Sequence, residues 1–144
     1  MTFSIREALP VDAEAIYDLN TSEMGYSFPL EATQSQLIKL LSSGSDKIFV
    51  ALVNSEVVGY VHANNYDLLY APHMKNIMGI AVSHVYKRQG IGKALLEQVD
   101  HWAVETGATA VRLVSGVSRK EAHAFYRACG YSGDKQQLNL KKIL

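Results

Sequence analysis

The pattern of apolar and polar positions predicts alternating strands and helices along the whole chain. Six segments have the composition or the alternation of β-strands, and a short seventh strand is placed near Tyr131. The six lie at residues 3–8, 47–53, 56–63, 76–83, 109–115 and 136–143. Asn54-Ser55 predicts a hairpin turn between the second and third segments, whereas residues 76–83 are apolar on both faces, as in a central strand.

The helical segments show apolar residues three and four positions apart. We expect the first helix to begin at Pro10, because proline suits a first helical position, and a loop to follow over residues 21–30. Thr33 and Gln36 have the spacing of a capping box, which predicts a second helix that runs to about Leu41. The stripes of the third and fourth helices are Leu95, Leu96, Val99, Trp102 and Ala103, and Ala122, Phe125, Tyr126 and Cys129.

The predicted order of elements, β-α-α-β-β-β-α-β-α-β, indicates the fold class. It corresponds to an α/β fold in which a mixed central sheet of six or seven strands is flanked by about four helices. The 144 residues suit one domain with one core, and no interdomain linker interrupts them. We therefore expect residues 1–144 to form a single domain.

Composition and charge argue against several classes of function. The chain has 14 Lys and Arg and 14 Asp and Glu, so its zero net charge gives no sign of a nucleic-acid-binding surface. No apolar run has the length of a membrane span, and the N-terminus lacks a signal-peptide pattern. The single cysteine, Cys129, cannot form an internal disulfide, which favours a cytoplasmic location. We expect no nucleic-acid or membrane partner and no metal.

The segment after the apolar strand is the strongest candidate for a binding site. It is basic and has two glycines ahead of the third predicted helix, at Lys87, Arg88, Gln89, Gly90, Ile91, Gly92 and Lys93. Backbone N–H groups in such a loop and in a first helical turn lack internal partners, so they can bind a phosphate. The N–H groups of residues 88–93 are therefore expected to seat a diphosphate. The alternative is an ordinary strand-to-helix turn with solvated charges.

A second motif follows this loop further along the chain. Its residues follow the pattern A-x-x-x-Y-x-x-x-G-[FY] at Ala122, Tyr126, Gly130 and Tyr131, and the loop follows basic-x-x-G-x-G at Lys87, Gly90 and Gly92. Together, and in this order, the two segments resemble the GNAT superfamily of N-acetyltransferases. In that family an acetyl-CoA loop, written [RQ]-x-x-G-x-[GA], follows the fourth strand. Lys87 here replaces the usual arginine or glutamine, so it supplies charge without a planar fork.

The resemblance implies the cosubstrate and the roles of several residues. The fourth strand would be splayed, with a bulge eased by Gly79, and the pantetheine arm of acetyl-CoA would bond to Ile80, Ala81 and Val82. Tyr126 would lie near the cofactor sulfur and protonate the leaving thiolate, and Ser118 stands where an asparagine often contacts pantetheine. From the residues alone, Tyr126 is more simply a core aromatic and Ser118 is equally a helix cap.

The residue that removes a proton from the amine is less well defined. Many family members have a glutamate on the fourth strand, but the register places Met78 there, and methionine cannot take a proton. The remaining candidate bases are Glu23, Tyr26, His62, Asp67 and His73. A base is unnecessary if the amine arrives neutral. The reaction that we expect is direct attack of a primary amine on acetyl-CoA in a ternary complex.

The resemblance places the acceptor site near residues 21–31 and 131–138. Met24, Tyr26 and Phe28 would form an apolar wall, and Glu23 and Asp134 would attract a cation. We expect a small-molecule amine, such as a polyamine, an amino sugar or an amino-acid-like amine. The alternatives are a peptide α-amine or a lysine side chain, or a non-catalytic acyl-CoA-binding regulatory module. A homodimer through the late strands would cover the edges of an open sheet.

Overall fold

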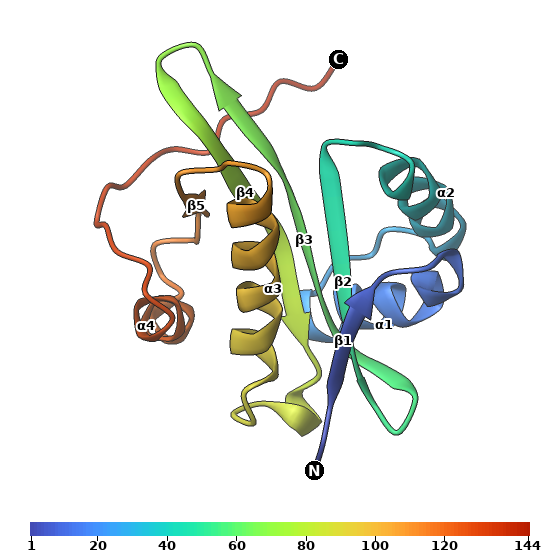
Figure 1. The fold of residues 1–144 in the computed structure, drawn as a ribbon. Helices are drawn as coiled ribbons and strands as arrows, with labels where there is room; N and C mark the ends of the chain where they lie inside the picture. Colours follow the sequence, from blue (N-terminus) through green and yellow to red (C-terminus); the bar gives the residue numbers. More distant parts are fainter. The chain divides into compact units, whose positions relative to one another are not determined.

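A five-stranded mixed sheet organises residues 1–113, the first of two units into which the chain divides (Figure 1). The computed structural model describes residues 1–144. The strands are β1 (Ser4–Glu7), β2 (Asp46–Val53), β3 (Glu56–Leu68), β4 (Ala71–Val82) and β5 (Val111–Arg112), in that spatial order. Strands β1 to β4 are antiparallel to their neighbours, and β5 is parallel to β4. The helices are α1 (Ala13–Met24), α2 (Leu30–Leu41), α3 (Ile91–Glu105) and, in the second unit, α4 (Lys120–Ala128).

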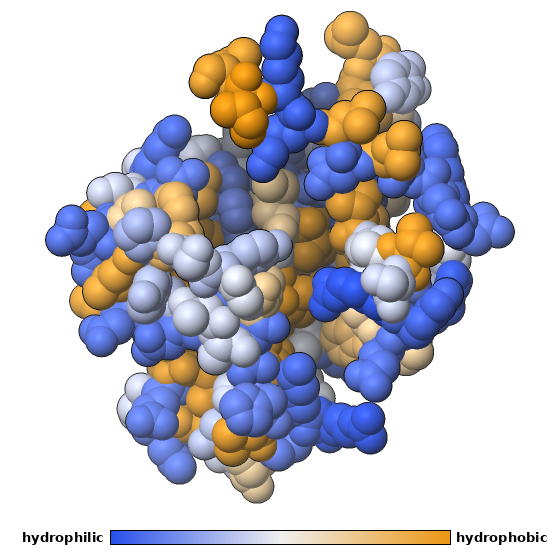
Figure 2. Space-filling model, turned by 180° about the vertical axis from the view of Figure 1, so that it is seen from behind, coloured by the Kyte–Doolittle hydropathy of each residue, from blue (hydrophilic) through white to orange (hydrophobic).

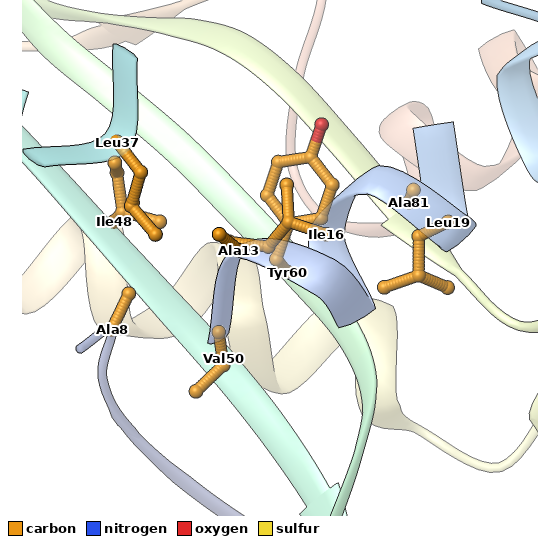
Figure 3. Close-up of a cluster of buried hydrophobic side chains, with 9 residues drawn as sticks. All are labelled: Ala8, Ala13, Ile16, Leu19, Leu37, Ile48, Val50, Tyr60 and Ala81. Atoms are coloured by element: carbon orange, nitrogen blue, oxygen red, sulfur yellow. The ribbon is translucent and has the colours of Figure 1, made fainter. Parts of the chain in front are cut away.

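Alternation along β3 separates two helical layers on opposite faces of the sheet. A Cβ atom added at Gly59 would lie 3.4 Å from Leu95 of α3, so Gly59 and, by alternation, Val61 face α3. Tyr60 lies on the opposite face, in an apolar cluster with residues of α1, α2 and β2 (Figure 3). In Figure 3 the Tyr60 ring lies beside Ile16, and its hydroxyl points away from the cluster. The polar end of Tyr60 is therefore available outside the core.

The predicted stripe of the third helix is confirmed by its burial. Leu95, Leu96, Val99, Trp102 and Ala103 of α3 are all buried, and Gly107 follows the helix with φ of 79°. Burying one large aliphatic side chain stabilises the fold by about 1.5–3 kcal/mol relative to leaving it exposed. This stripe fixes α3 against the sheet and so fixes the position of its N-terminus.

The turn of the β2–β3 hairpin is as predicted, whereas the β3–β4 hairpin differs from the prediction. Asn54 and Ser55 have φ of 50° and 68°, which matches the two-residue turn expected between β2 and β3. The β3–β4 hairpin is longer than predicted, because polar residues in it bond to one another. Lys75 Nζ donates to Asn65 Oδ1 at 2.6 Å and lies 3.9 Å from the centre of the Trp102 ring. The hairpin end, at the upper right of Figure 2, carries exposed hydrophobic atoms.

The prediction of six or seven strands is wrong, because the sheet has five. Residues 136–143 and the segment near Tyr131 form no strand, and Leu138 and Leu140 are exposed. Alternation describes the faces that a strand would present, but it does not supply a partner strand. The run at residues 109–115 contains only the short β5, although Thr109 N and Ala110 O already bond to His73 O and Lys75 N of β4.

Two predicted boundaries near α1 and α2 also differ. Helix α1 extends to Met24 and ends at Gly25 with φ of 72°, so the loop is shorter than residues 21–30. Helix α2 begins at Leu30, and Thr33 lies inside its first turn. The Thr33 hydroxyl donates to Pro29 O at 2.9 Å rather than capping the helix. Threonine can make either bond, so the capping-box spacing did not determine the start.

The second unit, residues 114–144, contains the predicted fourth helix. Helix α4 ends before Gly130, which has φ of 96°, and Tyr131 N donates to Tyr126 O at 3.0 Å. The expected stripe on α4 is half-buried. None of the helices has the length and apolar character needed to cross a bilayer.

Candidate active site

The segment between β4 and α3 places a row of backbone donors at a helix N-terminus. We call residues 87–93 the glycine loop. Gly90 has φ of 87° and precedes α3, and its carbonyl accepts the first helical bond, from Ala94 N at 3.0 Å. None of the N–H groups of residues 88–93 donates a hydrogen bond within the chain. These donors lie at the positive end of the α3 dipole, so the loop can bind an anion with several oxygens.

Space and charge in the glycine loop also suit an anion. No atom lies within 4 Å of a Cβ placed on Gly90. Arg88 adopts the left-handed conformation with φ of 63°, which turns the backbone at an exposed position. Lys87, Arg88 and Lys93 are all exposed. A ligand can therefore approach the backbone closely, and three cationic residues lie within the same short loop.

The half of β4 nearest the glycine loop has a free backbone edge. Strand β4 pairs with β5 only at Lys75 and Asn76, so residues 77–82 have no strand on that side. Ser83 N donates to Val58 O of the β3 side at 2.8 Å. Because successive backbone groups alternate in direction, Ala81 faces β3 as Ser83 does, whereas Ile80 and Val82 face the free edge. An extended ligand arm could pair with these two residues.

A bulge in β4 interrupts its regular pairing with β3. The β3–β4 register pairs His62 with Gly79 and Ala63 with Ile77, which leaves Met78 as an extra residue. The expected bulge at Gly79 is thus confirmed. Beside it is a pocket of about 290 Å³ whose lining comes from α1, the following loop, β3 and β4. The lining residues are Asn20, Met24, Tyr26, Phe28, Tyr60, His62, Met78 and Gly79.

Two pairs of polar groups belong to this pocket. The Tyr60 hydroxyl donates to Asn20 Oδ1, and burial, followed by the charge of Tyr26, raises the pKa of Tyr60 to about 12. Tyr60 therefore stays protonated at neutral pH. His62 Nε2 lies 2.7 Å from Asp46 Oδ1, so the carboxylate can orient the ring. The pocket thus has one fixed hydroxyl and one group able to exchange a proton.

The other candidate bases lie elsewhere. Asp67 and His73 form a 2.6 Å pair near the end of the β3–β4 hairpin, and His73 also contacts Lys75. Neither lines the pocket. Tyr26 does line it and is 61% exposed. Of the five candidates, the pocket therefore contains only Tyr26 and His62.

Glu23 connects the end of α1 with the segment that leads into the glycine loop, and it does not line the pocket. Its carboxylate accepts from His84 Nδ1 at 2.9 Å and lies 3.7 Å from Lys87 Nζ. Burial raises the pKa of Glu23, but the hydrogen bond from His84 and the charges of His84 and Lys87 outweigh it and hold the pKa below its usual value. Glu23 is thus placed to position the loop.

Tyr126 and Ser118 belong to the second unit. Tyr126 is half-buried, and its ring centre lies 5.4 Å from that of Phe125 and 5.9 Å from that of Tyr131. Burial raises the pKa of the Tyr126 hydroxyl, despite an opposing effect of Arg119. The expectation that Ser118 caps α4 is wrong, because Arg119 occupies the cap position and no side chain caps the helix. The turn at residues 116–119 moves the helix start one residue further on.

Comparison with known proteins defines the class. Residues 13–131 match the model of the acetyltransferase (GNAT) family, so the chain belongs to this family and is an acyltransferase. It is 27% identical to an aminoglycoside N(6')-acetyltransferase type 1 of Stenotrophomonas maltophilia, covering 89% of this chain and 85% of that protein. It is also 27% identical to an aminoalkylphosphonate N-acetyltransferase of Salmonella typhimurium, covering 88% and 83%.

Solved structures agree on the fold. The aminoglycoside acetyltransferase AAC(6')-Iy, in complex with the bisubstrate analogue CoA-S-monomethyl-acetylneamine, superposes with a TM-score of 0.88 over 100% of both chains at 16% identity. A transcriptional regulator from Bacillus halodurans gives a TM-score of 0.87 at 19% identity, covering 98% of this chain and 100% of that one. The five strands and four helices described above are thus a GNAT fold.

Proposed function

We propose that this protein transfers an acetyl group from acetyl-CoA to the primary amine of a small molecule. The amine nitrogen attacks the thioester carbonyl carbon directly, the C–S bond breaks, and an amide and CoA are formed. The amine proton passes to a base, and the leaving thiolate takes up a proton. The observation that carries the proposal is the set of unbonded N–H groups at residues 88–93 beside the free edge of β4.

The glycine loop would bind the diphosphate of acetyl-CoA. The N–H groups of Arg88, Gln89, Gly90, Ile91, Gly92 and Lys93 supply donors for its oxygens, and Lys87, Arg88 and Lys93 supply charge. The pantetheine arm would extend along the free edge of β4. Ile80 and Val82 would bond to it, and one of their N–H groups would face the thioester carbonyl, where negative charge develops. Ala81, which faces β3, would support this edge.

Two groups would handle the protons of the reaction. We assign the removal of the amine proton to His62, with Asp46 holding its ring, because these are the pocket's only partnered acid–base pair. Tyr126 would protonate the thiolate, as the resemblance implies, and its raised pKa keeps it protonated at neutral pH. Ser118 is a further proposed contact to the pantetheine arm. Most of the rate would come from positioning the two reactants.

The first experiment measures CoA release and acetyl-CoA affinity with the same protein sample. The acceptor panel contains polyamines, amino sugars, amino acids, simple monoamines and short peptides. Turnover with a small amine supports the proposal, and turnover only with peptides would indicate a peptide or lysine acetyltransferase. Binding of acetyl-CoA without any turnover would replace the enzyme by an acyl-CoA-binding module. Absence of binding would overturn the assignment of the glycine loop.

A further inference from the structure

We propose that the acceptor is a monoamine carried on an uncharged aromatic or alkyl body, and not a polycation or an anion-bearing amine. This inference rests on the proposed acetyl transfer and names the substrate class of the same pocket. Its basis is the chemistry of the lining, which combines aromatic and thioether side chains with a small set of polar groups.

The first argument is the absence of formal charge. The lining contains no Asp, Glu, Lys or Arg. Two carboxylates adjoin lining residues, and both already have partners, because Asp46 bonds to His62 and Glu23, next to Met24 in α1, bonds to His84. An amino sugar with several ammonium groups would lose hydration there without gaining counter-charges, which is costly for each group. An amine with a phosphonate or carboxylate would likewise meet no cation.

The second argument is the apolar surface that the pocket exposes. Tyr26, Phe28 and Met78 are 61%, 52% and 55% exposed although they line one concave site. An apolar acceptor body would cover this surface and gain about 25 cal/mol for each Å² of apolar surface removed from water. Phe28 and Tyr26 could pack against an aromatic ring, and Met78 could adapt to its shape. The pocket volume of about 290 Å³ suits a ring with a short alkyl chain.

The third argument concerns the polar groups that would orient a single amine. The Tyr60 hydroxyl gives its proton to Asn20, so its oxygen can still accept a hydrogen bond from an ammonium group. A Cβ placed on Gly79 would lie 3.8 Å from this hydroxyl, so Tyr60 points towards the bulge. His62 lies on the same face of β3, two residues along. These groups can orient one amine, and the rest of the pocket offers apolar contacts.

The test compares kcat/KM at saturating acetyl-CoA for 2-phenylethylamine, spermidine, kanamycin and 2-aminoethylphosphonate. We expect 2-phenylethylamine to exceed each of the others at least tenfold. Met78→Glu, which adds a carboxylate to the lining, should lower kcat/KM for 2-phenylethylamine and raise it for spermidine. Phe28→Ser should raise KM for 2-phenylethylamine at little changed kcat. Ile38→Ser removes an exposed apolar residue of α2 outside the pocket and should change neither value.

A preference for kanamycin, spermidine or the phosphonate would overturn this inference and leave the acetyl transfer intact. Equal kcat/KM values for all four amines would overturn it as well. Failure to acetylate any of the four, with other panel amines accepted, would show that the pocket selects another class. Failure with every amine would instead contradict the proposed function itself. Circular dichroism of each variant verifies that a changed rate does not reflect unfolding.

Discussion

The glycine loop and the pocket beside the β4 bulge are built on different principles. The loop is seven consecutive residues, and its donors belong to the backbone, so its chemistry depends on conformation more than on side chains. The pocket gathers side chains from α1, the loop after it, β3 and β4, which are far apart in the sequence. Two relatives of equal 27% identity are named for chemically different acceptors. Under the proposed function, the acceptor could change through the side chains of the pocket while the glycine loop kept its conformation.

The largest effect should come from changing the glycine loop. Gly90→Glu places a side chain and a negative charge in the open space before the N-terminus of α3. Because Gly90 has φ of 87°, the variant also carries left-handed strain of about 1–2 kcal/mol. We expect acetyl-CoA affinity, measured by isothermal titration calorimetry, to fall by at least about a hundredfold, since a factor of ten corresponds to about 1.4 kcal/mol.

The matched control for this variant is Gly107→Glu at the other end of α3. Gly107 has φ of 79°, and no atom lies within 4 Å of its Cβ position, so the substitution carries similar strain and the same charge. It should lower the melting temperature at least as much as Gly90→Glu does, because its charge lies at the negative end of the α3 dipole, but leave acetyl-CoA affinity unchanged. A folded Gly90→Glu protein with wild-type affinity would remove the glycine loop from the binding site.

The contrast between the two regions also explains what the sequence could predict. The glycine loop was predictable because its signal is local: Gly90 and Gly92 stand beside basic residues between an apolar strand and a helical stripe. The partners of Tyr60 and His62 were not, because Asn20 and Asp46 come from other elements. The sequence did contain one signal that places two pocket residues together. Residues 60 and 62 are two apart in a strand, so they had to share a face.

The same reasoning applies to the fold. Strands with apolar alternation and helices with strong stripes were predicted well, as the burial of the α3 stripe shows. The extension of the β3–β4 hairpin was missed because Lys75 is buried by partners that composition does not reveal. Conversely, residues 136–143 alternate without forming a strand. A strand depends on a neighbour, and a single segment of sequence carries no information about it.

A narrower effect, confined to the rate, should come from the pocket. His62→Gln removes the group that we assign to the amine proton and should lower kcat by about 10²-fold, the lower end of what a general base contributes. Acetyl-CoA affinity should not change, which is the opposite of the result expected for Gly90→Glu. Steady-state kinetics gives kcat for the variant, and calorimetry gives its acetyl-CoA affinity.

Two further variants distinguish the proposed proton-accepting role of His62 from the positioning role of Asp46. Asp46→Asn should cause an intermediate loss in kcat, because Asp46 only positions His62. His101→Gln, at an exposed histidine on α3, serves as the control and should behave as wild type. If His62→Gln keeps wild-type kcat, the amine reaches the thioester already neutral and the pocket needs no base.

The smallest effect should come from Glu23, the residue that links the two regions. Glu23→Gln removes the charge that holds His84 and Lys87 at the start of the loop. It should raise KM for acetyl-CoA by no more than about fivefold, because exposed ion pairs are worth up to about 1 kcal/mol. The pKa of Glu23 lies below its usual value, so its contribution to stability is complete above the ordinary glutamate pKa of about 4.3 and is lost as the pH falls through the lowered value. The difference in melting temperature between wild type and variant should therefore shrink on acidification. Glu14→Gln, an exposed glutamate on the same helix, should show no KM effect. Equal KM values for the wild type and Glu23→Gln would mean that the glycine loop holds its conformation without help from α1, and that the two regions are independent.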